Sequence, residues 1–448
     1  MFESLLVANR GEIACRVLAT ARRIGLRTVA VYSEADATLP HVKAADEAVL
    51  LGPPPPGESY LDMAKVLEAA KQTGAQAVHP GYGFLAENAG FARAVLDAGL
   101  IWVGPSPEAI TAMGDKINAR NLMSDAGVPV AAGSREPLAD VESAVLAATA
   151  IGYPVMVKAA AGGGGIGMSV ADDEAALRTA FETARTRAER FFGNPAILIE
   201  RYLVAARHVE VQILGLADGS VLALGERDCS VQRRHQKVAE ETPSPGVGPD
   251  LRARMLTAAI RAGEAVGYQG AGTVECLVDP VAQDFVFLEM NTRLQVEHPV
   301  TEAVTGLDLV EAQLRIAAGA APGFDPASVT SAGHAIEMRV YAEDPRRFLP
   351  SPGTISRWDV PAGEGIRVDA GYAAGDTVTT FYDPLLAKLV VWGATRSVAL
   401  ERARSAIREF TIEGPKTNLA FFEELLEFPA FVEGDYDTGI VGLMRVPA

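Results

Sequence analysis

The sequence contains little cysteine and no long apolar run, and both shortages narrow the class of protein. Only 3 of its 448 residues are cysteines, and none of them stands in a CxxC spacing. This excludes a disulfide framework and a cysteine-rich zinc site. No stretch reaches the roughly 18 uninterrupted apolar residues that a membrane helix requires, and the first residues lack a signal-peptide pattern. We therefore expect a cytoplasmic protein without a membrane partner.

Basic residues are also too few to balance the acidic ones, which leaves a formal charge of −17 at pH 7. This charge argues against a nucleic-acid partner, which would require a basic face. The composition of 49% hydrophobic and 22% charged residues is typical of a globular protein. A chain of this length is too long for one core and should form two to four packed units.

Short apolar runs alternate with helical patterns in the first 110 residues. LLVAN, TVAVYS and AQAVHP have the composition of strands, and EIACRVLATARRIG and LDMAKVLEAAKQTG have helical spacing. This alternation predicts a parallel sheet covered by helices. Further on, YPVMVKAA and PAILIERYL predict strands, with a helix over 174–190 between them. Strands should dominate from 208 to about 300 and again beyond Gly333, with a helix near 397–410.

Two glutamates lie symmetrically about a predicted hairpin at residues 270–291. Its strands would be GTVECLVD and FVFLEMN, joined by the turn DPVAQD, which places Glu275 nearly opposite Glu289. Cross-strand neighbours lie about 4.5–5.5 Å apart, and like charges there repel each other. Mg²⁺ bound together with nucleotide phosphates would compensate this repulsion. The hairpin alone leaves open a pair of solvated surface glutamates.

Polar side chains alternate with apolar ones in the segment from Glu289 to Glu297. If this segment is extended, residues 289, 291, 293, 295 and 297 share one face, because side chains alternate along a strand. That face would carry two carboxylates, two amides and a guanidinium. The pattern predicts the polar floor of a site, with a half-exposed strand as the alternative.

Four consecutive glycines, Gly162 to Gly165, follow a predicted strand that contains Lys158. The residues MSVADDE after them predict a short strand and then a helix cap, so the loop joins two strands. This differs from the strand-to-helix turn of a dinucleotide site, and no GxxxxGK[ST] motif is present, which excludes a Walker P-loop. Glycines let backbone N–H groups approach phosphates, which favours a phosphate-covering lid over a flexible linker.

Several motifs together resemble the biotin carboxylases, which are ATP-grasp enzymes. They are HPGYGFLAEN, MGDK, VKAAAGGGGIGM, ERDCSVQRRHQK, GTVECL and EMNTRLQVEHPVTE, and they follow that family's order and spacing from about residue 3 to the C-terminus. The resemblance implies ATP- and bicarbonate-dependent carboxylation of biotin, through carboxyphosphate, to give carboxybiotin, ADP and phosphate. This would be the first half-reaction of an acetyl-CoA or acyl-CoA carboxylase.

The resemblance also implies the architecture of an α/β protein with three units. Residues 1–112 would form the parallel-sheet N-terminal domain. Residues 113–325 would form a two-lobed ATP-grasp domain with a glycine-rich lid around 131–203. Residues 326–448 would form a β-rich C-terminal domain.

Roles for individual residues follow from the same resemblance. ATP would be bound by Lys116, Lys158, Gly162, Gly163, Gly164, Gly165, Glu200, Arg201, Leu203, His208, Gln232, His235 and Leu277. Mg²⁺, or Mn²⁺ in its place, would be held by Glu275, Glu289 and Asn291. Bicarbonate would be held by Lys237, Arg293, Gln295 and the Val296 backbone, with Glu297 as the general base. Tyr82 and Gly83 would line the biotin entrance, and Arg339 would stand beside the ureido oxygen. Glu297, Arg293, Arg339 and Lys237 are thus the implied catalytic residues.

The sequence departs from the family pattern at the glycine loop and lacks a biotinylation site. Ile166 and Ser169 stand where basic residues are usual, which predicts altered kinetics toward ATP. No Ala-Met-Lys-Met sequence occurs, so either biotin would arrive on a biotin carboxyl carrier protein or domain, or the chain is a fragment of a longer one. A carboxyltransferase subunit would use the product. The family implies a homodimer. Two alternatives stay open: another ATP-grasp ligase, or a non-catalytic nucleotide-binding subunit with an altered loop.

Overall fold

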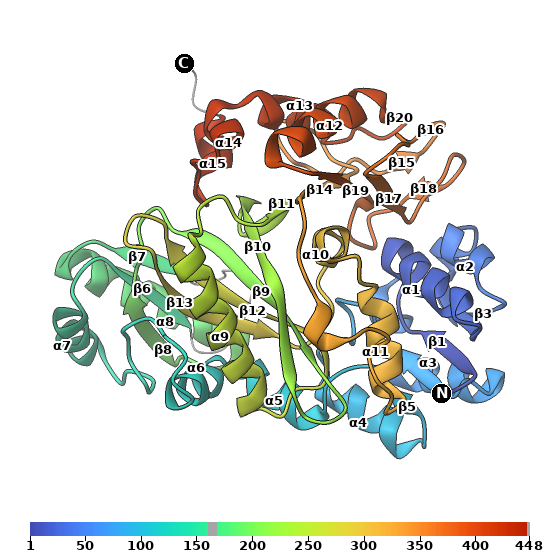
Figure 1. Cartoon of the computed structure of the whole chain (residues 1–448). Coiled ribbons are helices and arrows are strands. Elements are labelled where there is room, and N and C mark those ends of the chain that lie inside the picture. Colours follow the sequence, from blue (N-terminus) through green and yellow to red (C-terminus); the bar gives the residue numbers. More distant parts are fainter. Residues whose placement is uncertain (160–167, 446–448) are drawn as a thin grey trace.

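A five-stranded parallel sheet forms the amino-terminal part of the computed structural model, which describes residues 1–159 and 168–445 (Figure 1). In the order β3-β2-β1-β4-β5, the strands are β1 (Ser4–Val7), β2 (Arg27–Ser33), β3 (Glu47–Gly52), β4 (Ala77–His79) and β5 (Ile101–Trp102). The accompanying helices are α1 (Gly11–Arg23), α2 (Pro40–Ala44), α3 (Met63–Thr73), α4 (Ala89–Asp97) and α5 (Pro107–Gly114). The predicted parallel α/β unit is confirmed.

Local sequence explains where these helices begin and end. The Asp62 carboxylate accepts a hydrogen bond from the Lys65 backbone N–H and so caps α3 at its N-terminus. The helix ends at Gly74, whose φ of +63° lies in the left-handed region that glycine adopts without strain. Asn88 caps α4 in the same way, through the Phe91 N–H. These caps fix the loops that join the helices to the sheet.

A small three-stranded antiparallel sheet forms a separate layer at the left of Figure 1. It consists of β6 (Val155–Ala159), β7 (Ser169–Ala171) and β8 (Ile197–Arg201), in the order β7-β6-β8, and it packs against α7 (Val141–Ile151) and α8 (Glu174–Phe192). Helix α6 (Lys116–Asp125) precedes this unit. The antiparallel pairing of β6 with β7 confirms that the glycine segment joins two strands. Gly162 to Gly165 and Ile166 themselves lie outside the described residues.

The largest sheet has eight antiparallel strands in the order β13-β12-β9-β10-β11-β14-β19-β17. They are β9 (Arg207–Gly215), β10 (Val221–Arg233), β11 (Gln236–Thr242), β12 (Gly270–Asp279), β13 (Asp284–Asn291), β14 (His334–Tyr341), β17 (Ile366–Ala370) and β19 (Leu385–Gly393). Because β11 pairs with β14, the sheet continues across residue 326, where the sequence predicts a boundary between two units. A helix that was not predicted, α9 (Pro249–Ala265), lies among these strands in the sequence and contacts β9 and β10.

The remaining elements lie in the middle and the upper part of the molecule in Figure 1. They are α10 (His298–Thr305), α11 (Leu309–Ala317), the short strands β15 (Gly353–Thr354), β16 (Arg357–Asp359), β18 (Thr377–Val378) and β20 (Thr411–Glu413), and the helices α12 (Arg396–Glu409), α13 (Leu419–Glu427), α14 (Pro429–Glu433) and α15 (Ile440–Leu443). The helix predicted near 397–410 is α12, whereas the three helices that follow were not predicted. None of the described helices is long and apolar enough to cross a bilayer. The predicted mixed α/β class is confirmed.

Candidate active site

The β12–β13 hairpin pairs Glu275 directly with Glu289, as the sequence predicts. Glu275 is only 4% exposed, so the alternative of a solvated surface pair is wrong. Burial raises the pKa of Glu289, and the neighbouring Glu275 charge raises this pKa further. A cation with oxygen ligands would relieve this repulsion, and the carboxylates together with the Asn291 amide oxygen offer suitable donors.

Glu275 is the centre of a buried polar cluster. Its Oε1 accepts hydrogen bonds from Lys237 Nζ at 2.7 Å, Asn291 Nδ2 at 2.8 Å and Gln295 Nε2 at 3.2 Å. Its Oε2 lies 2.9 Å from His208 Nε2. Burial alone would raise the pKa of Glu275, but Lys237 and His208 hold this pKa well below its usual range. Glu275 is therefore ionised at neutral pH.

Residues 292–297 do not form the extended segment that a shared face of residues 289–297 would require, and the alternative of a half-exposed strand is wrong. Strand β13 ends at Asn291, and the chain then turns into α10, whose second residue is Pro299. Side chains, rather than a partner strand, bind the peptide groups of this segment: Lys388 Nζ donates to the Val296 carbonyl at 2.9 Å, and His298 Nδ1 lies 2.7 Å from the Gln295 carbonyl. The polar side chains nevertheless meet at one site, as the pattern predicts.

The Arg293 guanidinium is oriented by three side chains. Its Nη2 donates to Asn291 Oδ1 at 3.0 Å and its Nη1 to Gln295 Oε1 at 2.9 Å. Its Nε donates to Glu87 Oε2 at 2.9 Å, and Glu87 was not among the predicted site residues. A planar guanidinium held in this way is preorganised to bind a small planar anion.

Glu297 is a fully buried carboxylate between two cations. Its Oε1 accepts a hydrogen bond from Lys237 Nζ at 2.8 Å, and its Oε2 accepts one from Arg339 Nη2 at 2.9 Å. Burial alone would raise the pKa of Glu297, but Lys237 and Arg339 hold this pKa well below its usual range. The carboxylate is thus ionised, which a general base requires. Cys229 Sγ lies 3.8 Å from Oε1, and burial raises the pKa of this thiol well above its usual range, which favours the neutral thiol over a reactive thiolate.

Two further buried residues, Glu210 and Arg227, adjoin this cluster and were not predicted from the sequence. Glu210 Oε2 lies 2.6 Å from Lys237 Nζ, and Glu210 Oε1 accepts a hydrogen bond from Arg227 Nε at 2.5 Å. Both residues are fully buried. The signal was present in HVEVQILG, where polar side chains at 208, 210 and 212 alternate with apolar ones in a strand that is buried throughout. The same alternation had identified residues 289–297.

Lys158 and Glu200, both predicted to contact ATP, form an ion pair between β6 and β8. Lys158 Nζ lies 2.5 Å from Glu200 Oε2, and Arg120 of α6, which was not predicted, lies 3.5 Å from Glu200 Oε1. Arg201 Nη1 instead donates to the Tyr153 carbonyl at 2.9 Å. Lys158, Glu200 and Arg201 lie on the three-stranded sheet, in which the glycine segment connects β6 with β7.

The other predicted ATP-binding residues lie on the large sheet or beside it. His208 pairs with Leu277 between β9 and β12, and Gln232 pairs with Lys237 between β10 and β11. His235 is exposed at the β10–β11 turn with a φ of +66°. Leu203 is half-buried after β8. Lys116, Glu289 and Asn291 line a cavity of about 220 Å³.

A second cavity, of about 450 Å³, joins the predicted biotin and bicarbonate residues. Tyr82, Gly83 and Arg339 line it together with Arg293 and Val296. Aromatic rings from the N-terminal and C-terminal parts, Phe84, Phe381 and Tyr382, form more of its wall. Aromatic rings together with charged side chains in one cavity suit a flat organic ring that carries a polar head.

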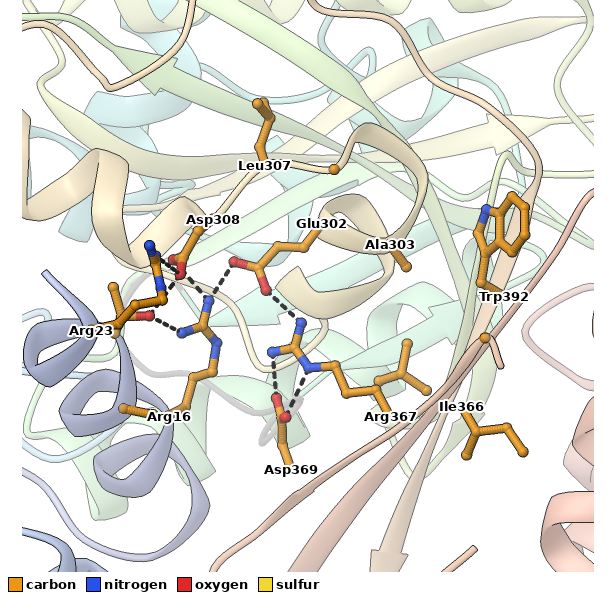
Figure 2. A pocket seen from close by; sticks show the side chains of 15 residues that line it. Arg16, Arg23, Glu302, Ala303, Leu307, Asp308, Ile366, Arg367, Asp369 and Trp392 are labelled. Atoms are coloured by element: carbon orange, nitrogen blue, oxygen red, sulfur yellow. Dashed lines mark hydrogen bonds and ion pairs between the residues drawn. The ribbon is translucent and has the colours of Figure 1, made fainter. Parts of the chain in front are cut away.

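A third hollow, of about 660 Å³, is bordered by a network of ion pairs (Figure 2). Arg16 Nη2 lies 2.7 Å from Glu302 Oε1 and 2.9 Å from Asp308 Oδ1. Arg367 contacts the other oxygen of Glu302 at 2.7 Å and Asp369 at 2.7 Å. Glu302 of α10 thereby links α1 of the N-terminal part to β17 of the C-terminal part.

The comparison with protein families first defines the class. Residues 115–322 match the model described as "Carbamoyl-phosphate synthase L chain, ATP binding domain". The part of the chain that carries the Glu275–Glu289 pair and the Lys158–Glu200 pair is therefore an ATP-binding domain of this class.

The flanking parts define the family within that class. Residues 1–110 match "Biotin carboxylase, N-terminal domain", and residues 337–442 match "Biotin carboxylase C-terminal domain". The chain belongs to the biotin carboxylase family, as its motifs predict. It is 52% identical over 438 residues to Biotin carboxylase 2 of Bacillus subtilis, with 98% of each chain covered.

Two solved structures support the same assignment. A biotin carboxylase from Campylobacter jejuni, solved as a β-γ-ATP complex, has 43% identity and a TM-score of 0.95 over 99% of each chain. The biotin carboxylase domain dimer of Hydrogenobacter thermophilus 2-oxoglutarate carboxylase, solved with MgADP, ADP and bicarbonate, has 43% identity and a TM-score of 0.93 over 100% of each chain.

Proposed function

We propose that the chain uses MgATP and bicarbonate to carboxylate biotin on a separate carrier, releasing ADP and phosphate. The observation that carries this proposal is the convergence of Lys237, Arg293 and Arg339 around the buried Glu297 carboxylate, beside the Glu275–Glu289 pair. Such a site can hold a nucleotide-bound cation and a small anion next to a base. The relatives named biotin carboxylase support the same activity.

Mg²⁺, or Mn²⁺ in its place, fits the residues at the hairpin. Glu275, Glu289 and Asn291 would hold it, because two paired carboxylates and an amide oxygen are suitable ligands, and burial together with the Glu275 charge raises the pKa of Glu289. When bound, the ion neutralises charge on the nucleotide phosphates during phosphoryl transfer. The residues proposed to bind ATP are Lys116, Lys158, Gly162, Gly163, Gly164, Gly165, Glu200, Arg201, Leu203, His208, Gln232, His235 and Leu277.

Bicarbonate activation would use the segment after β13. Arg293, Lys237, Gln295 and the Val296 backbone would bind the anion, and the Glu297 carboxylate would take its proton as a bicarbonate oxygen attacks the γ-phosphorus of ATP. ADP leaves, and the carboxyphosphate that forms breaks down to CO₂ and phosphate. The buried Lys237 and Arg339 contacts keep Glu297 ionised before the proton arrives.

Biotin would enter the 450 Å³ cavity past Tyr82 and Gly83. The phosphate released from carboxyphosphate takes the N1 proton, and N1 then attacks CO₂. Arg339 would stabilise the negative charge that develops on the ureido oxygen. Since Arg339 already contacts Glu297 at 2.9 Å, the base and this guanidinium lie close enough to serve one reaction centre.

The partners would follow from the chemistry. A biotin carboxyl carrier protein or domain would deliver the biotin, and a carboxyltransferase subunit of an acetyl-CoA or acyl-CoA carboxylase would use the carboxybiotin. We also propose a homodimer, because the Hydrogenobacter thermophilus domain was solved as a dimer. The domain limits 1–112, 113–325 and 326–448 remain proposals, with the lid around 131–203.

The purified chain, MgATP, bicarbonate and free biotin suffice for the test. We expect ADP release and incorporation of labelled bicarbonate into biotin, both dependent on biotin and on bicarbonate. ADP release that does not depend on biotin would favour another ATP-grasp ligase. Failure to cleave ATP under any of these conditions would favour a non-catalytic nucleotide-binding subunit.

A further inference from the structure

Lys388 of β19 is fully buried, although it lies behind the site rather than in it. Its Nζ donates a hydrogen bond to the Val296 carbonyl at 2.9 Å. The same Nζ lies 3.1 Å from Glu12 Oε2 and 4.0 Å from Asp369 Oδ2. A buried ammonium is tolerated only where such partners replace its water.

The bond from Lys388 fixes one of the two peptide groups around Val296. The other is fixed by His298, whose Nδ1 lies 2.7 Å from the Gln295 carbonyl. Burial lowers the pKa of His298 well below its usual range, so the ring is neutral and must carry its proton on Nδ1 to bind this carbonyl. Because each peptide unit is planar, fixing the carbonyls of residues 295 and 296 orients the N–H groups of Val296 and Glu297.

Glu12 of α1 connects Lys388 to the wall of the 450 Å³ cavity. Its Oε1 accepts a hydrogen bond from the Tyr82 hydroxyl, while its Oε2 faces Lys388. Glu12, Tyr82 and Val296 all line the cavity. One ammonium from the C-terminal part thus joins the segment that carries the base to the N-terminal wall of the pocket.

We propose that Lys388, with Glu12 as its counterion, is a positioning residue for bicarbonate activation. It acts through the Val296 peptide and holds residues 296 and 297 in the geometry that binds bicarbonate and presents the Glu297 base. This inference rests on the proposed function. An ion pair that only stabilises the fold would have no selective effect on one substrate.

The test removes both charges of the pair together. Singly, K388M and E12Q each leave a buried charge without its partner and should lower the melting temperature strongly. The double variants K388M/E12Q and K388Q/E12Q, in which the pair is neutral, should regain most of the lost melting temperature. In a folded neutral pair we expect the KM for bicarbonate to rise roughly tenfold or more, because the Val296 carbonyl has lost a charged donor. The KM for ATP should stay within about twofold of wild type.

Lys416 offers a matched control, because it forms an exposed ion pair with Asp344 at 2.9 Å. The K416M variant should keep both KM values. A folded neutral pair with the wild-type KM for bicarbonate would overturn the inference and leave the proposed function intact. Failure of both neutral pairs to fold would also overturn it, because Lys388 would then serve stability alone. Absence of bicarbonate-dependent ADP release in the wild-type chain would instead remove the proposed function.

Discussion

Glu275 and Glu289 occupy paired positions on β12 and β13, yet the pKa values of their carboxyl groups are displaced in opposite directions. Burial tends to raise both pKa values. Lys237 and His208 reverse this effect at Glu275. At Glu289 the Glu275 charge instead raises the pKa further. A cation bound at this pair would therefore act mainly on Glu289.

Replacing Glu289 by glutamine should weaken metal binding selectively. The E289Q variant keeps the shape of the side chain and removes a carboxylate that forms no ion pair with the described residues, so the fold should tolerate it. We expect the Mg²⁺ concentration for half-maximal ADP release to rise about tenfold or more. Titration of Mg²⁺ at saturating ATP measures this shift, and E401Q, at an exposed position on α12, is the control. An unchanged Mg²⁺ requirement would contradict the assignment.

Replacing Glu297 by glutamine should remove the general base while retaining the binding surface. Loss of a positioned base typically costs about 10²–10⁴-fold in rate, so bicarbonate-dependent ADP release by E297Q should fall by that factor. Lys237 keeps Glu210 and Glu275 as partners, and Arg339 keeps Glu240 at 2.6 Å, so the site should remain folded. Retention of more than about a tenth of the wild-type rate would show that another group takes the proton.

Replacing Arg339 by lysine should affect biotin more than ATP. The charge is kept, but the planar fork that contacts Glu240 and Glu297 is lost. We expect kcat/KM for biotin to fall roughly 10–100-fold, since the ureido charge loses an oriented donor. Biotin titrations at saturating ATP and bicarbonate measure this ratio. An equal fall in kcat/KM for ATP would instead indicate that the substitution distorts the whole site.

Spacing along the chain, without the family resemblance, predicted those parts of the site that depend on sequence neighbours. Glu275 and Glu289 flank one short turn, so their pairing follows from symmetry about it. The shape of residues 292–297 depends instead on Lys388, which lies 92 residues beyond Val296, and no local pattern signals such a contact. Glu210 likewise reaches Lys237 only because β10 lies between their strands in the sheet. Contacts of this kind depend on the tertiary fold rather than on spacing.

The contribution of Glu241 to stability should depend on pH in a defined direction. Its carboxylate is buried between His334 Nε2 at 2.6 Å and Arg396 Nε at 2.7 Å, and it accepts a hydrogen bond from the Tyr436 hydroxyl at 2.5 Å. Burial alone would raise the pKa of Glu241, but His334 and Arg396 lower it to about 2 from an ordinary value of 4.5. Because the folded pKa is the lower one, the stabilisation is complete above the unfolded pKa and is lost as the pH falls toward the folded pKa.

The E241Q variant tests this sign. At pH 7 its free energy of unfolding should be lower than that of wild type by a few kcal/mol, on the order of the shift in pKa multiplied by 1.4 kcal/mol. The difference should stay constant from about pH 8 to pH 5 and shrink below about pH 4.5, because the unfolded wild-type chain then binds a proton at Glu241 while the folded carboxylate, with its pKa of about 2, stays ionised. Denaturant unfolding of both proteins at several pH values measures the difference. If the difference in free energy of unfolding stays constant or widens down to about pH 3.5, the Glu241 charge contributes nothing to folding. Packing around the side chain would then account for the lower stability of the variant.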